Sequence, residues 1–137
     1  MNDLELMRLA EAARESAYAP YSNFCVGAAL LARDGRVFTG CNIENAAYTP
    51  SNCAERTAFF KAVSEGVRAF DAIAIVGGKR GEVADFCAPC GVCRQVMAEF
   101  CDADFRVILG NSQKLSLHTL GELLPYAFSP KDLEQQE

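Results

Sequence analysis

The chain has 137 residues, which suits one domain spanning 1–137 that buries about two-thirds of the surface its unfolded form would expose. Half of the residues are hydrophobic and 23% are charged, and this composition excludes an intrinsically disordered chain. The net charge is -5 and the longest basic run is Lys79-Arg80, so we expect no nucleic acid partner, since such proteins contact phosphates through basic patches.

The first half of the chain predicts a helix followed by a β-hairpin. Residues 3–17 place apolar side chains at helical spacing, and Pro20 ends this segment. Two mostly apolar strands follow over 24–31 and 37–41. The turn between them contains Asp34-Gly35, a pair typical of tight antiparallel hairpins.

The second half of the chain alternates helices with short strands. We expect helices over 53–65, 91–100 and 119–124, strands over 72–76 and 105–109, a loop over 77–81 and a loose polar tail from Ser129. Helices that lie between strands form crossovers onto a sheet, whereas the hairpin is antiparallel. The pattern therefore predicts an α/β fold with a mixed sheet covered by helices.

The cysteine content is unusual for such a chain. No secretory signal and no apolar run long enough to span a bilayer is apparent, so we expect a cytoplasmic protein with no membrane partner. The chain has seven cysteines, an odd number, and the cytoplasm is reducing. Metal binding or catalysis is therefore a better explanation for them than disulfides.

Three of these cysteines form a split metal-binding pattern. Cys53 begins one predicted helix, and Cys90 and Cys93 lie at the start of the next. Two crossover helices that start at the same sheet edge would bring these thiols together. Three thiolates suit Zn²⁺ but leave its fourth position open for water, which is the arrangement of a catalytic site. Glu55, two residues after the first ligand, is placed to move the protons of that water.

The charge of this site needs compensation. Three thiolates around Zn²⁺ leave a net negative charge, which opposes ionisation of a bound water. The two helix N-termini each supply up to about half a positive charge. Arg56 lies three residues after Cys53 and can donate hydrogen bonds to the sulfurs.

Two other uses of the same cysteines remain open. Cys87-Ala88-Pro89-Cys90 is itself a CxxC motif, so Cys87 could supply a fourth sulfur and close a structural zinc site. A dithiol redox protein that used Cys90 and Cys93 would need no metal.

Four stretches of the chain together resemble the small homotetrameric zinc-dependent cytidine deaminases. They are Ala19-Pro20-Tyr21-Ser22-Asn23-Phe24, Gly40-Cys41-Asn42-Ile43-Glu44-Asn45-Ala46, Cys53-Ala54-Glu55-Arg56-Thr57-Ala58 and Pro89-Cys90-Gly91-Val92-Cys93-Arg94-Gln95. The resemblance covers nearly the whole chain and implies a three-layer α-β-α arrangement with a mixed five-stranded sheet. One departure is Tyr126, which stands where we expect a smaller residue.

The resemblance also implies roles for individual residues. Asn42 and Glu44 would hold the ribose hydroxyls, although without the resemblance they would be interpreted as a solvated turn. Phe24 would pack on the pyrimidine, although without the resemblance it would be interpreted as a core aromatic residue. The base edge would meet the Ala54 N–H and the Ala88 carbonyl. Neighbouring subunits of a homotetramer would contribute Tyr21, Ala46, Tyr48 and Phe128.

The implied reaction is hydrolytic deamination of cytidine and deoxycytidine to the uridines with release of ammonia, a step of pyrimidine salvage. Zinc would be the cofactor, and Glu55 would shuttle protons between the water, the pyrimidine N3 and the departing amine. Cysteine at position 53 argues against deaminases of deoxycytidylate or transfer RNA, which place histidine there. A deaminase of a related aminopyrimidine nucleoside is the alternative within enzymes, and a structural zinc module with Cys87 as fourth ligand is the alternative outside them.

Overall fold

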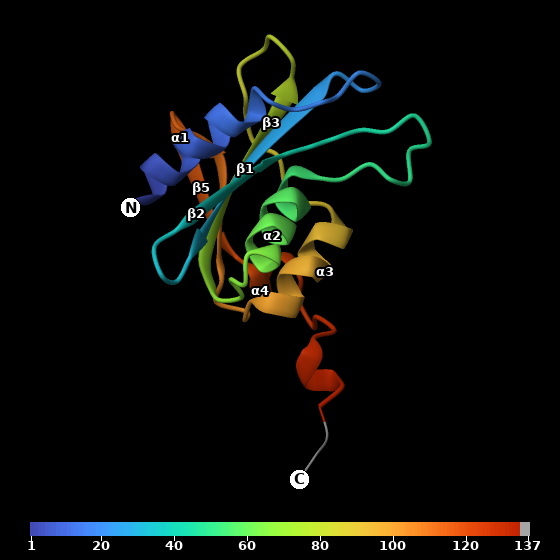
Figure 1. Ribbon diagram of the computed structural model, residues 1–137. Coiled ribbons are helices and arrows are strands. Elements are labelled where there is room, and N and C mark those ends of the chain that lie inside the picture. The colour runs from blue at the N-terminus through green and yellow to red at the C-terminus, as the bar shows by residue number, and fades with distance from the viewer. Residues whose placement is uncertain (135–137) are drawn as a thin grey trace.

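Five strands form one mixed sheet in the computed structural model, which describes residues 1–134 (Figure 1). The strand order is β2-β1-β3-β4-β5. The elements are α1 (Asp3–Arg14), β1 (Phe24–Ala32), β2 (Val37–Cys41), α2 (Ala54–Ser64), β3 (Phe70–Lys79), α3 (Gly91–Phe100), β4 (Arg106–Asn111), β5 (Lys114–Thr119), α4 (Leu120–Leu123) and a 3-10 helix, η1 (Pro130–Asp132).

Two apolar layers cover the two faces of this sheet. Alternate residues of β1 point to opposite sides, so Leu30 packs in the core beneath α2 and α3, whereas Ala29 packs in the core beneath α1. Figure 1 shows α1 on one side of the sheet and α2 with α3 on the other. The α1 layer lies very close to β1 at Gly27, where a Cβ would come 2.0 Å from the Ala10 carbonyl oxygen. The predicted three-layer arrangement is confirmed.

Strand direction determines where the helices begin. β1 is antiparallel to both β2 and β3, so β2 and β3 run the same way, and β4 is parallel to β3. The chain leaves β2 and β3 at the same edge of the sheet and enters α2 and α3 after the connecting loops. Both helix N-termini therefore lie at one edge, as the crossover pattern predicted.

The sheet differs from the sequence prediction at two places. Residues 77–79 continue β3 and do not form a loop, because Gly77 pairs with Val26 and Lys79 pairs with Phe24 on β1. The strand β5 was not predicted individually, although its leucines alternate with polar residues, the pattern of a strand with one buried face. It pairs antiparallel with β4.

The ends of the chain also differ from the prediction. The first helix ends at Arg14 and not at residue 17, and its N-terminus is capped by Asn2, whose side chain accepts a hydrogen bond from the Glu5 N–H at 2.8 Å. The expected loose tail contains η1, which begins where the Ser129 N–H donates to Asp132 at 2.8 Å. Residues 135–137 of that tail lie outside the described residues. Within residues 1–134, every helix is too short or too polar to cross a bilayer.

Replacing Phe59 by alanine tests the core beneath α2. Its ring is 0% exposed and contacts the rings of Phe70, Phe100 and Phe105 at centroid distances of 5.1 to 6.2 Å. We expect Phe59→Ala to lower the free energy of unfolding by about 4 kcal/mol. The neighbouring Phe60 is 49% exposed, so Phe60→Ala is the matched control and should cost under about 1 kcal/mol. Equal losses in urea unfolding would contradict this packing.

Candidate active site

Three cysteine sulfurs meet where α2 and α3 begin. Cys53 is the N-cap of α2, Cys90 is the N-cap of α3, and Cys93 lies in the first turn of α3. The Cys53 and Cys90 sulfurs are 3.8 Å apart, the Cys90 and Cys93 sulfurs are 3.5 Å apart, and all three lie within 4.8 Å of one another. The predicted convergence of the two segments is confirmed.

The spacing of these sulfurs fits a zinc ion. Tetrahedral coordination with Zn–S bonds of about 2.3 Å places two sulfurs about 3.8 Å apart, close to the observed separations. The Arg56 Nε is buried without a hydrogen-bond partner in residues 1–134. An unused guanidinium donor beside thiols suits a site in which all three sulfurs become negatively charged when they bind a metal.

Hydrogen bonds already favour negative charge on the Cys53 sulfur, and a backbone N–H donates to the Cys90 sulfur. The Arg56 Nη2 donates to the Cys53 sulfur at 3.2 Å, and the Cys93 N–H donates to the Cys90 sulfur at 3.5 Å. The pKa of Cys53 is lowered to about 5, first because the Cys93 thiol donates to it and then because of Arg56. The pKa of Cys93 is raised, because its proton is held in that hydrogen bond. The negative charge of the Cys53 thiolate is thus compensated by a side chain, that of Arg56. The Cys90 sulfur instead receives a backbone N–H at the start of α3.

Glu55 is a buried carboxyl group beside this cluster. It lies in the first turn of α2 and is 4% exposed. Burial first, and then the charge of the neighbouring Cys53, raise its pKa to about 7 against opposing hydrogen bonds. A carboxyl group with such a pKa can both accept and donate a proton near neutral pH, which is what general acid–base catalysis requires.

A cavity of about 260 Å³ joins the cluster to polar residues from the hairpin end. It is lined by Val26, Asn42, Glu44, Ser51, Asn52, Cys53, Ala54, Glu55, Arg56, Cys87, Ala88 and Cys90. The loop after β2 returns to the cluster because Ile43 and Asn52 exchange two backbone hydrogen bonds of 2.9 Å. The bridge thereby holds Asn42 and Glu44, the neighbours of Ile43, close to Cys53, the neighbour of Asn52.

Five of the residues considered for substrate contact do not line this cavity, and one of them, Tyr21, is 53% exposed. Phe24 is 39% exposed, so it is not a core aromatic, and its ring lies near Gly77 and Cys87 at the cavity wall. Ala46 and Tyr48 are exposed in the loop between β2 and α2. Phe128 is 58% exposed and lies beside Gln95, which donates to its carbonyl at 2.7 Å.

Cys87 lies in the cavity wall but does not belong to the cluster of Cys53, Cys90 and Cys93. Among residues 1–134, the only cluster of metal-ligand type contains Cys53, Cys90 and Cys93. Burial raises the pKa of the Cys87 thiol to about 11, so it is neutral at physiological pH. Its sulfur packs over Gly77, where a Cβ would lie 2.9 Å away.

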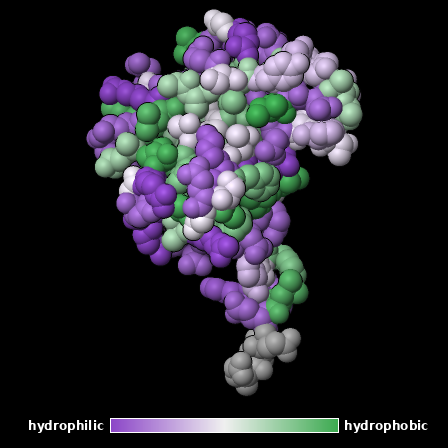
Figure 2. All heavy atoms as spheres, in the orientation of Figure 1, coloured by the Kyte–Doolittle hydropathy of each residue, from purple (hydrophilic) through white to green (hydrophobic). Residues whose placement is uncertain are grey.

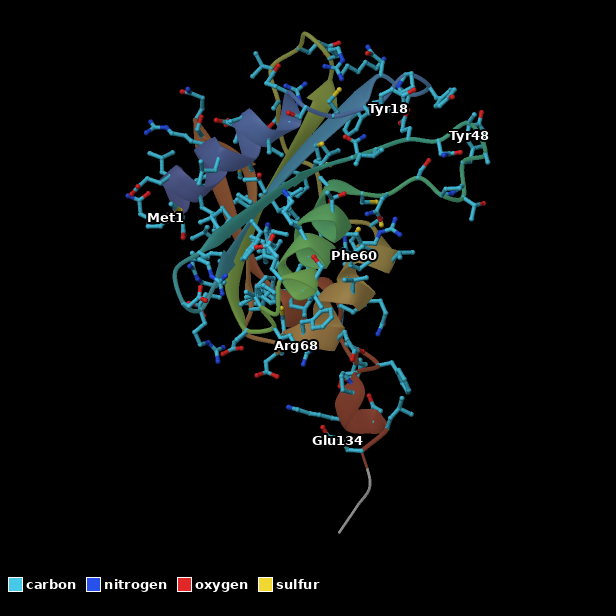
Figure 3. All side chains as sticks on the ribbon, viewed as in Figure 1. Met1, Tyr18, Tyr48, Phe60, Arg68 and Glu134 are labelled. Carbon is cyan, nitrogen blue, oxygen red and sulfur yellow. The ribbon has the colours of Figure 1, made fainter. Side chains whose placement is uncertain are left out.

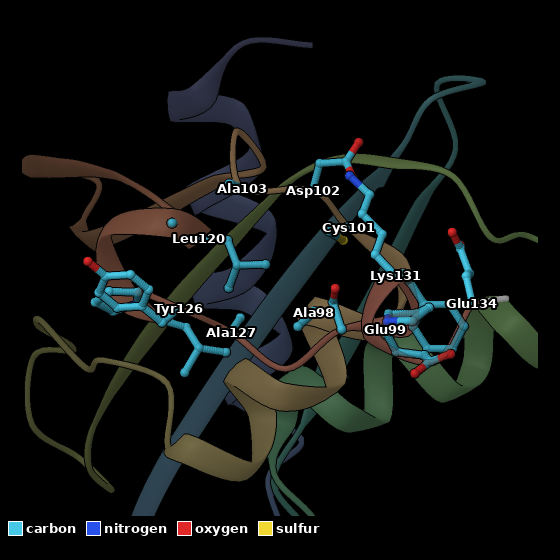
Figure 4. A pocket seen from close by; sticks show the side chains of 16 residues that line it. Ala98, Glu99, Cys101, Asp102, Ala103, Leu120, Tyr126, Ala127, Lys131 and Glu134 are labelled. Carbon is cyan, nitrogen blue, oxygen red and sulfur yellow. The ribbon is translucent and has the colours of Figure 1, made fainter. Parts of the chain in front are cut away.

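A larger cavity of the described chain lies elsewhere. It measures about 550 Å³ and lies between the C-terminal end of α3, α4 and the segment that follows (Figure 4). Its lining includes Cys101, Tyr126 and Lys131 but no residue of the cysteine cluster. Tyr126 adopts φ 55°, a left-handed conformation that favours glycine. The chemistry of the chain is therefore concentrated in the smaller cavity.

Several residues that help to build the site were not predicted from the sequence. Ser51 and Asn52 line the cavity, and their position directly before Cys53 was the available signal. Arg94 donates to the Pro89 carbonyl at 2.8 Å and to the Leu123 carbonyl at 2.6 Å. It thereby holds the segment that carries Cys90.

Comparison with known proteins agrees with this geometry. Residues 1–109 match the profile of the family described as the cytidine and deoxycytidylate deaminase zinc-binding region. The chain belongs to this deaminase family. The family description and the cysteine cluster together make zinc the metal of this deaminase site.

Individual members of the deaminase family are similar along most of the chain. A cytidine deaminase of Sporosarcina psychrophila is 55% identical over 130 residues, which cover 94% of this chain and 93% of that protein. The crystal structure of a cytidine deaminase from Burkholderia pseudomallei matches with a TM-score of 0.85 at 53% identity, covering 93% of this chain and 100% of that one. A blasticidin-S deaminase of Bacillus cereus is 30% identical over 131 residues, or 93% of this chain and 92% of that protein.

Removing Arg56 tests charge compensation at the cluster. We expect Arg56→Ala to bind zinc about 10- to 100-fold more weakly, because the Cys53 thiolate loses its guanidinium donor. Zinc transfer to a chromogenic chelator measures this affinity. Arg68→Ala is the matched control, since Arg68 is an exposed arginine at the far end of α2 from the cluster (Figure 3). Equal zinc retention in the two variants would contradict the role of Arg56.

Proposed function

We propose that the protein catalyses hydrolytic deamination of cytidine and deoxycytidine to the uridines with release of ammonia, as a cytoplasmic enzyme of pyrimidine salvage. One observation carries this proposal: a buried carboxyl group, Glu55, lines a cavity together with Cys53 and Cys90, two members of a three-thiol cluster that can hold one zinc ion. The similarity to named cytidine deaminases supports the choice of substrate.

Each chemical role falls to a residue at the cavity. Zinc held by Cys53, Cys90 and Cys93 supplies Lewis acidity and an activated water. Glu55 takes one proton from the water whose oxygen bonds to C4 and passes it to N3 of the pyrimidine. It then takes the remaining proton from the new C4 hydroxyl and gives it to the amine, so that the C4–N bond breaks, ammonia leaves and the C4 carbonyl forms. Arg56 stabilises the thiolate of Cys53 throughout.

The remaining cavity residues bind the nucleoside in this proposal. Asn42 and Glu44, at the end of the cavity formed by the hairpin, bind the sugar hydroxyls, because an amide and a carboxylate together can accept from and donate to them. The Ala54 N–H and the Ala88 carbonyl contact the base edge near the metal. Phe24 packs on the pyrimidine, and the position of its ring beside the cavity wall supports that contact.

In this proposal the whole chain, residues 1–137, is one catalytic domain. Four copies of the chain form the active homotetramer. Tyr48 is 72% exposed and Phe128 is 58% exposed, and neither lines the cavity of its own chain. Tyr48 lies at the far end of the loop between β2 and α2 (Figure 3). Hydrophobic side chains also reach the surface around α2 and α3 (Figure 2), and Val92 of α3 is 58% exposed. These side chains, with Ala46 and Tyr21, are available to complete the site of a neighbouring copy.

Glu55→Gln tests the proton-transfer role. The amide keeps the shape of the side chain but cannot carry the proton, so we expect kcat for cytidine to fall at least about 10³-fold while zinc is retained. Turnover is measured as loss of cytidine absorbance with ammonia release measured in parallel. Glu65→Gln, at the opposite end of α2, is the control and should retain wild-type kcat. A wild-type protein that releases no ammonia from cytidine or deoxycytidine would refute the proposed function.

Hybrid tetramers test whether sites are shared between subunits. Phe128→Ala and Glu55→Gln each lower activity in this proposal, but a hybrid contains sites that combine Glu55 of one chain with Phe128 of another. We therefore expect co-expression of the two variants to restore part of the wild-type activity. Activity no greater than that of the two variants assayed separately would show that Phe128 does not act across a subunit boundary.

A further inference from the structure

A hydroxyl group outside the cavity connects two of the proposed nucleoside contacts. The Ser22 hydroxyl donates to the Glu44 Oε2 at 2.5 Å and accepts from the Phe24 N–H at 3.0 Å. Glu44 is the proposed sugar contact and Phe24 the proposed pyrimidine contact. One side chain thus holds groups that would meet opposite ends of the substrate.

The carboxylate of Glu44 is already largely occupied by this turn. Its Oε1 accepts from the backbone N–H groups of Tyr21 at 3.0 Å and Ser22 at 3.1 Å. Because each carboxylate oxygen accepts about two hydrogen bonds, Oε1 is saturated and Oε2 keeps one acceptor position beyond Ser22. The orientation set by Ser22 therefore decides where that position points. The hydrogen bond from Ser22 is also the main reason that the pKa of Glu44 lies below its usual value.

The same network continues to Asn42. Its Nδ2 donates to the Phe24 carbonyl at 2.8 Å, and its Oδ1 accepts from the Val26 N–H at 2.9 Å. The backbone of Phe24 is thus held on its N–H side by Ser22 and on its carbonyl side by Asn42. Movement of either partner would change the position of the aromatic ring as well as the polar groups.

We propose that Ser22 is a positioning residue for nucleoside recognition: it aims the remaining acceptor of Glu44 at a sugar hydroxyl and fixes the Phe24 ring relative to it. This inference rests on the proposed function and names a determinant of substrate discrimination within that same site. A substrate with ribose hydroxyls should depend on Ser22 more than one without them.

The test compares Ser22→Thr with Ser22→Val, which have the same shape and differ in the hydroxyl. Ser22 is exposed, so both side chains have room. We expect Ser22→Thr to behave like wild type, and Ser22→Val to raise KM for cytidine about tenfold with kcat within about twofold. For 2′,3′-dideoxycytidine the rise in KM should be about twofold. Ser112→Ala, in the turn between β4 and β5, is the control and should change neither substrate.

Binding separates failure of this inference from failure of the proposed function. The Kd for uridine, measured by calorimetry on the zinc-loaded protein, should rise about tenfold in Ser22→Val and not in Ser22→Thr. If the wild type binds uridine but does not deaminate cytidine, the proposed function fails while this comparison still decides the role of Ser22. An unchanged Kd in Ser22→Val, equal losses on cytidine and the dideoxy substrate, or a wild type that binds no nucleoside would overturn the inference.

Discussion

The meeting of three cysteine sulfurs at the starts of two helices is the constraint on which the rest of the structure depends. It requires β2 and β3 to run in the same direction, so that the chain leaves the sheet at one edge before both α2 and α3. It also requires both loops to return to that edge. The bridge between Ile43 and Asn52 does this for one loop, and Arg94 holds the Pro89 carbonyl of the other.

The site concentrates opposing charges within a small volume. Thiolates and the carboxylate of Glu55 repel one another, and burial of the carboxylate is itself unfavourable, which is why its pKa rises to about 7. Arg56 and the helix start at Cys90 supply the positive side of this balance. A cluster without these donors would favour protonated thiols and bind metal less tightly. The arrangement of donors around the sulfurs is therefore part of the chemistry as well as of the fold.

The sequence predicted the metal cluster better than the sheet. Cys53 and the pair Cys90 and Cys93 lie in two short segments at helix starts, so local patterns were sufficient once a crossover topology was assumed. The end of β3 was wrong because residues 77–79 become a strand only through pairing with β1. The connection of Ser22 to Glu44 spans 22 residues and depends on a turn whose shape no local pattern indicates. The assignment of Phe24 to the pyrimidine remains a prediction, since the ring lies beside the cavity and not in its lining.

The central claim is that three cysteine sulfurs hold the zinc and leave one position for a water. X-ray absorption at the zinc edge of the wild-type protein tests this most directly, because it counts the sulfur neighbours of the metal. The account predicts three sulfur neighbours at about 2.3 Å and one oxygen or nitrogen neighbour at about 2.0 to 2.2 Å. Four sulfur neighbours would show that Cys87 closes the site, and a zinc closed in this way would contradict the account.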